Sequence, residues 1–163
     1  MKFLVDAMLG NLARWLRLFG YDALYANDLV APGKDGLSDT DLAKVAKEQD
    51  RRLITRDKEF AKRLPDAILV PGMDNVENLR LIQHTLRIQL AFHQDLARCT
   101  ICNGALEKIS DKESVQPLVP KKTFMHYDEF WKCSNPRCGK IFWQGSHFED
   151  IRALEKQLLE KNS

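Results

Sequence analysis

Four cysteines stand in two short-spaced pairs in the second half of the chain. Cys99 and Cys102 enclose two residues, and Cys133 and Cys138 enclose four. Pairs of this kind form knuckles that each present two thiolates to one ion, as in structural zinc sites. Because four thiolates leave no open position for a substrate, the spacing predicts a structural zinc rather than a catalytic one.

Two disulfides and unligated thiols are the alternatives to zinc. The apolar start at Phe3 is interrupted by Asp6, too early for a secretory signal, so we expect a cytoplasmic chain in which structural disulfides do not persist. Gly104 and Gly139 follow the two pairs and suit tight turns around the sulfurs. His147 is the one alternative ligand near the second pair.

Three aspartates occupy positions that could form a second, different site. Asp6 directly follows the apolar run 3–5, Asp57 follows the run 53–55, and Asp39 opens the helix after the second predicted strand. In a parallel sheet these places share the carboxyl edge, where open α/β folds bind ligands. Carboxylates converging there would hold Mg²⁺ or Mn²⁺, which prefer oxygen ligands.

Each acidic position also has a structural interpretation. Asp6 and Asp39 fit helix caps, the latter within a variant capping box of Ser38 and Asp41, and Asp57 fits a turn after a strand. On a helix Asp41 points about 200° away from Asp39, at ~100° per residue, which favours Asp39 as the ligand.

The elements that must position these residues follow from apolar periodicity. Short apolar runs alternate with stretches of helical spacing, which indicates parallel crossover units and a sheet covered on both faces. The predicted strands are residues 3–5, 22–27, 53–55 and 67–70. The predicted helices are residues 9–19, 38–49, 58–64 and 76–90.

The pattern changes around Gln94, where the alternation stops and the cysteines and most aromatic residues begin. We therefore predict an α/β domain over residues 1–93 and a zinc ribbon with a closing helix, at 149–161, over residues 94–163. A ribbon this small needs a cross-link such as a bound metal, because the apolar surface that it buries scarcely offsets the conformational entropy lost on folding.

Composition excludes several classes of protein. The chain has 163 residues, 44% of them hydrophobic and 29% charged, as in an ordinary globular protein. Its formal net charge is only +2, and no apolar run approaches the roughly 18 residues of a membrane helix. The low net charge means that a site for a polyanion such as RNA must come from a local cluster of basic residues. We expect Arg14, Arg17 and Arg56 to hold phosphates. The ribbon aromatics Trp131, Phe142 and Trp143 could stack on single-stranded bases, but the small size of the ribbon favours their forming its core.

The order of motifs along the chain resembles the Mut-seven C-terminal RNase family, a branch of the PIN-like nucleases. The resemblance is carried by residues 3–10 (FLVDAMLG), 12–17 (LARWLR), 20–22 (GYD), 38–39 (SD) with Leu42 and Ala46, 53–57 (LITRD), 98–99 (RC), 102–104 (CNG), 138–140 (CGK) and 143–147 (WQGSH). It spans both predicted domains.

This resemblance implies a PIN-like three-layer α/β/α domain with a parallel sheet, an appended zinc ribbon, and metal-dependent hydrolysis of RNA phosphodiester bonds. Asp6, Asp39 and Asp57 match the family's acidic ligands of Mg²⁺ or Mn²⁺. Asp28 is a weak candidate for a fourth carboxylate, so the resemblance implies one or two ions.

Two other functions stay open on the sequence alone. One is a non-catalytic adaptor that keeps the PIN-like fold and ribbon and binds RNA or protein. The other is a toxin-like PIN nuclease controlled by a partner. Dependence of RNA cleavage on a divalent metal separates the nuclease from the adaptor.

Overall fold

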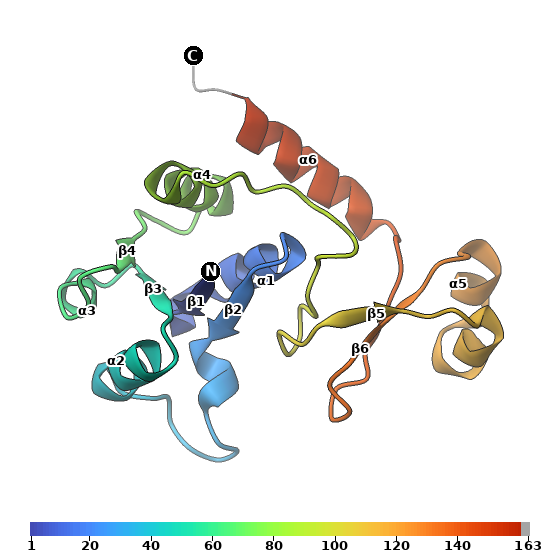
Figure 1. Ribbon diagram of the computed structural model, residues 1–163, viewed down its shortest axis with the longest axis horizontal. Helices are drawn as coiled ribbons and strands as arrows, with labels where there is room; N and C mark the ends of the chain where they lie inside the picture. Colours follow the sequence, from blue (N-terminus) through green and yellow to red (C-terminus); the bar gives the residue numbers. More distant parts are fainter. Residues whose placement is uncertain (161–163) are drawn as a thin grey trace.

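A parallel four-stranded sheet lies at the centre of the first part of the chain in the computed structural model, which describes residues 1–160. Its strands are β1 (Lys2–Val5), β2 (Asp22–Tyr25), β3 (Arg52–Thr55) and β4 (Ile68–Leu69), in the order β2-β1-β3-β4 (Figure 1). Val5 at the end of β1 is in register with Tyr25 of β2 and Ile54 of β3. The strand ends therefore form one carboxyl edge, as the alternating pattern predicts.

Helices cover both faces of this sheet. The helices are α1 (Gly10–Leu18), α2 (Asp39–Glu48), α3 (Lys58–Ala61), α4 (Asn75–Leu86) and, after the ribbon, α6 (His147–Leu159). Phe3 and Val5 of β1 pack into one core cluster with residues of α1, α4 and α6, whereas Leu4 packs into a second cluster with residues of α2 and the buried Phe60 of α3. This alternation along β1 builds the three-layer α/β/α architecture predicted from the sequence.

Several elements begin later or end earlier than predicted, because a 3-10 helix or a left-handed residue precedes or follows them. The second strand ends at Tyr25, because the 3-10 helix η2 (Ala26–Leu29) follows it directly, and another 3-10 helix, η1 (Ala7–Leu9), separates β1 from α1. Helix α4 ends at Leu86, since Arg87 has a left-handed backbone with φ of 52°.

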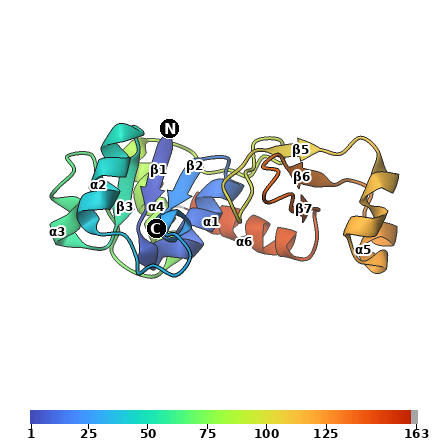
Figure 2. The ribbon, with the colours of Figure 1, turned by 90° about the horizontal axis from the view of Figure 1, so that it is seen from below.

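The cysteine-containing segment forms a small antiparallel sheet. Its strands are β5 (Leu106–Lys108), β6 (Trp131–Cys133) and β7 (Ile141–Phe142), and two short helices, η3 (Lys112–Leu118) and α5 (Lys121–His126), lie between β5 and β6. Its own core consists of Val115, Phe130 and Ile141. Figure 2 shows this ribbon beside the parallel sheet, with α5 at its far end.

Helix α6 returns to the parallel-sheet domain after the ribbon. It packs against α4, and Leu154 and Leu158 belong to the same core cluster as Phe3 and Val5 (Figure 1). The closing helix predicted at 149–161 thus begins two residues earlier, and its predicted last residue lies outside the described part of the chain. The boundary near residues 93–98 stays a prediction, but α6 contributes to the first core.

Within residues 1–160, no helix is both long and apolar enough to span a membrane.

Candidate functional site

The four cysteines meet in one cluster. All four Sγ atoms lie within 4.8 Å of one another, with 3.7 Å between Cys99 and Cys138 and 3.4 Å between Cys102 and Cys133. Tetrahedral zinc with Zn–S bonds of about 2.3 Å places its sulfurs about 3.8 Å apart, so the cluster fits this ion. His147, the alternative ligand, is 97% exposed and does not join the cluster.

Backbone geometry brings the thiols together. Asn103 has a left-handed backbone with φ of 65°, and a Cβ on Gly104 would lie 2.9 Å from the sulfur of Cys133. Burial raises the pKa of Cys102, but hydrogen bonds from the Gly104 amide and from neighbouring side chains outweigh it and lower the pKa to about 7. Donors of this kind stabilise a thiolate, the form that binds zinc.

Asn103 docks this cysteine knuckle onto the edge strand β2. Its Oδ1 accepts from the Ala23 amide at 3.1 Å, and its Nδ2 donates to Asp22 Oδ1 at 2.7 Å. Arg51 donates to the same carboxylate at 2.7 Å. Burial alone would raise the pKa of Asp22. The hydrogen bonds from Arg51 and Asn103 and the charge of Arg51 lower it by more, so the pKa lies below its usual value. Sequence reasoning missed this role of Asn103, and the Asn-Gly step after the first cysteine pair is its only signal.

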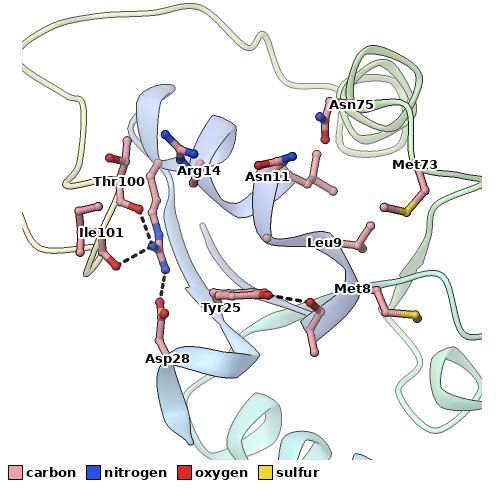
Figure 3. A pocket seen from close by; sticks show the side chains of 14 residues that line it. Met8, Leu9, Asn11, Arg14, Tyr25, Asp28, Met73, Asn75, Thr100 and Ile101 are labelled. Atoms are coloured by element: carbon pink, nitrogen blue, oxygen red, sulfur yellow. Dashed lines mark hydrogen bonds and ion pairs between the residues drawn. The ribbon is translucent and has the colours of Figure 1, made fainter. Parts of the chain in front are cut away.

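Arg17 joins the same knuckle to α1 and is not available to RNA. Its side chain is 2% exposed, and its guanidinium donates to Asp28 Oδ2 at 2.7 Å and to the carbonyls of Ala23, Thr100 and Ile101. Figure 3 labels Asp28, Thr100 and Ile101 among these acceptors. The expectation that Arg17 holds phosphates does not fit this arrangement, because the guanidinium is buried among protein acceptors. The same ion pair engages Asp28, the weak candidate for a fourth metal ligand.

Thr55 connects two of the three candidate acidic ligands at the carboxyl edge. Its hydroxyl donates to Asp6 Oδ2 at 2.5 Å and accepts from the Asp57 amide at 3.0 Å. Asp6 is buried at the end of β1, and its Oδ1 accepts from its neighbouring amide at 2.7 Å. Asp57 caps α3 through Oδ1. Asp57 Oδ2 accepts no hydrogen bond from residues 1–160, so one oxygen of this carboxylate is free within that part of the chain.

The structural cap of α2 uses Ser38 and Asp41, not Asp39. Ser38 Oγ accepts from the Asp41 amide at 3.2 Å and donates to Asp41 Oδ2 at 2.6 Å. Asp39 is 44% exposed, and its nearest charged partner is Arg63 at 3.8 Å. Capping therefore does not explain Asp39.

The three aspartates are spaced more widely than the thiolates. Among residues 1–160, the cysteine cluster is the only set of three or more cysteine, histidine or acidic ligands with all ligand atoms within 4.8 Å of one another. The chemistry of the acidic donors suits a hard cation, and the assignment of Asp6, Asp39 and Asp57 as its ligands stays a prediction.

A cavity of about 610 Å³ opens one residue beyond Asp6, where the carboxyl edge meets α1 (Figure 3). Its wall runs from Ala7 through the start of α1 and includes Tyr25, whose hydroxyl donates to the Ala7 carbonyl at 2.7 Å. The exposed Arg14 lines the cavity near Thr100 of the cysteine knuckle, and Asn75 lines it from α4 (Figure 3).

Comparison with known proteins identifies the family. A family model described as the Mut7-C RNAse domain matches residues 1–154. No curated protein and no solved structure matched the chain. The match covers the parallel sheet, the aspartates at its edge, all four cysteines and most of α6. The chain therefore belongs to the Mut7-C RNAse domain family.

Proposed function

We propose that this protein is a divalent-metal-dependent ribonuclease that hydrolyses RNA phosphodiester bonds, with the zinc ribbon assisting RNA binding. The observation that carries the proposal is the joint attachment of Asp6 and Asp57 to Thr55 at the carboxyl edge, beside a cavity, in a chain of an RNase family. Membership of the family supports nuclease-type chemistry. The proposal adds the divalent metal and the residues that would hold it.

Asp6, Asp39 and Asp57 would hold one or two Mg²⁺ or Mn²⁺ ions. Such an ion neutralises charge on a phosphodiester and lowers the pKa of an attacking water. The protein's part is positional: the Thr55 hydroxyl fixes the Asp6 carboxylate, and the cap of α3 fixes Asp57. Rigid placement on strand ends is what a catalytic constellation requires.

Basic residues near this edge would orient the RNA backbone. Arg14 is exposed on α1 and has no hydrogen-bond or ion-pair partner in the described part of the chain. Arg56 lies between Thr55 and Asp57, with its guanidinium against the sulfur of Met73. Contacts from such residues go to phosphates, so RNA affinity should fall with salt while sequence preference stays weak.

Metal dependence tests the proposal. The purified protein is incubated with labelled structured and unstructured RNA in Mn²⁺, in Mg²⁺ or after brief EDTA treatment, and its zinc content is measured after each incubation. We expect cleavage in Mn²⁺ or Mg²⁺, loss of cleavage in EDTA with zinc retained, and recovery when Mn²⁺ is added back. RNA binding without cleavage under every condition would replace the nuclease with the adaptor.

A further inference from the structure

A second cavity, of about 910 Å³, lies between α1, α6 and the ribbon strand β7. Its lining is rich in aromatic side chains, each half-buried rather than enclosed. These are Trp15, Phe92, Tyr127, Phe142, Trp143 and Phe148. Tyr127 and Trp143 also pack against the ribbon's enclosed core of Val115, Phe130 and Ile141, and Ile141 itself lines the cavity, so the cavity lies against that core and leaves part of each ring exposed. An open cavity lined by this much aromatic surface indicates a binding site rather than a core.

This aromatic cavity adjoins the cavity that begins beside the carboxyl edge. The two share five lining residues, which are Asn11, Arg14, Asn75, Thr100 and Ile101. In Figure 3, Asn11 and Arg14 come from α1, and Asn75 comes from the start of α4. The first cavity's lining begins at Ala7, the residue after Asp6, so a polymer that lies across both cavities would pass beside the end of β1.

The charge of the aromatic cavity suits a polyanion. Its lining holds Arg14, Arg98 and Lys140 against a single acidic residue, Asp150, which lies 3.7 Å from His147. The side chains of Arg14 and Lys140 have no hydrogen-bond or ion-pair partner within residues 1–160, so both are free to meet phosphates.

We propose that this aromatic cavity binds single-stranded RNA on one side of the cleaved bond, with bases stacked on Trp143 and its neighbours and the backbone held by Arg14 and Lys140. The inference rests on the proposed function and specifies its substrate class. Unpaired bases expose the faces that aromatic side chains stack on, whereas the bases of a duplex are already stacked on each other. The two cations in the lining that are unpartnered within residues 1–160, Arg14 and Lys140, favour a phosphate backbone over a protein partner.

Gly145 sets the orientation of the Trp143 indole. A Cβ at this position would lie 2.9 Å from Trp143 Nε1, so an alanine would force the ring to move. Gly145→Ala therefore tests the position of the indole without removing it.

RNA binding to the 163-residue chain, purified without chelators, tests the inference. The probe is a labelled oligouridine of about 12 nucleotides, within the usual range of single-strand sites, and its Kd is measured by fluorescence anisotropy with an Asp6→Asn chain that does not cleave it. We expect Trp143→Ala to raise Kd about 5- to 100-fold, as for loss of a stacked base. Arg14→Ala should raise Kd by about 3- to 10-fold, as for loss of a phosphate contact.

Matched controls separate RNA contact from folding. Lys47→Ala removes an exposed cation from α2, on the opposite face of the sheet, and should leave Kd within about twofold. Because Arg14 is exposed and unpartnered, Arg14→Ala keeps the test valid even if Trp143→Ala disturbs the ribbon. A blunt RNA duplex of equal length should compete about tenfold more weakly than the single strand.

The outcomes distinguish this inference from the proposed function. Unchanged Kd in both Arg14→Ala and Gly145→Ala, or equal binding of duplex and single strand, would overturn the inference even if the protein cleaves RNA in Mn²⁺. Weakened binding in both variants supports it, even if no metal restores cleavage and the ribonuclease proposal fails. A chain that neither binds nor cleaves RNA overturns both.

Discussion

The guanidinium of Arg17 on α1 donates to the backbone carbonyl of Thr100, inside the first cysteine pair, at 3.0 Å. One buried side chain thus bonds to the metal knuckle and, through Asp28, to the segment after β2. The ribbon is therefore fastened to the parallel sheet by specific polar contacts, and its zinc site and the sheet's edge strand are physically coupled.

Replacing Arg17 should destabilise the whole chain. Arg17→Met keeps apolar bulk but leaves the carbonyls of Ala23 and Thr100 without their donors, at a cost of about 2–4 kcal/mol. The measurement is urea unfolding followed by circular dichroism. Arg14→Ala, three residues earlier on the same helix but exposed and unpartnered, is the control and should change stability by no more than about 0.5 kcal/mol. Equal stability of the two variants would show that the Arg17 contacts do not fasten the ribbon.

The protein should contain about one zinc per chain, by the four-thiolate ligand count. Cys133→Ser should lose the ion and unfold the ribbon, because zinc supplies folding energy that the small core around Phe130 lacks. The parallel sheet should persist but become less stable, since Asn103 would no longer be held against β2. Elemental analysis and amide hydrogen exchange check this. Less than a tenth of a zinc in protein purified without chelators would contradict the assignment.

Asp39 and Asp41 should differ sharply on substitution. Asp39→Asn should remove most metal-dependent cleavage, because its carboxylate is not used for capping and is assigned to the metal. Asp41→Asn should keep most of the activity and lose at most about 1 kcal/mol of stability through the weakened cap with Ser38. Initial cleavage rates at saturating Mn²⁺ decide between them, and the opposite pattern would move the site by two residues.

Stability should depend on pH through Asp22. A carboxyl whose pKa is lowered on folding stabilises the fold above its unfolded value, about 3.9, and this contribution disappears as the pH falls through the folded value. Asp22→Asn should cost about 1–2 kcal/mol at neutral pH, since Arg51 loses its charged partner. Urea unfolding at several pH values should show a steeper loss below about pH 4 in the parent than in Asp22→Asn. Parallel pH profiles would contradict the role of this carboxylate.

Apolar patterning predicted the strands and helices well because each kind of element has its own pattern. The central strands β1 and β3 are buried on both faces and appear as continuous apolar runs, whereas the helices bury one face and show apolar residues at helical spacing. The cysteine cluster was equally visible, since its spacing is local. Tertiary contacts were not: nothing local distinguishes the buried Arg17 from the exposed Arg14, and nothing in α6 shows that Leu154 packs against the first core. The contact of Asp6 and Asp57 with Thr55 could not be predicted either, because it depends on β1 and β3 being neighbours in the sheet.

The central claim is that carboxylates at the sheet edge hold the metal that cleaves RNA. The most direct test is the rate at which the Asp6→Asn/Asp57→Asn double variant cleaves unstructured RNA in Mn²⁺, with folding and zinc content matched to the parent. The account predicts a loss of at least about 100-fold, as is usual when a charged group that acts on the transition state is removed. A folded double variant that cleaves at the parent rate, in Mn²⁺ and in EDTA alike, would contradict it.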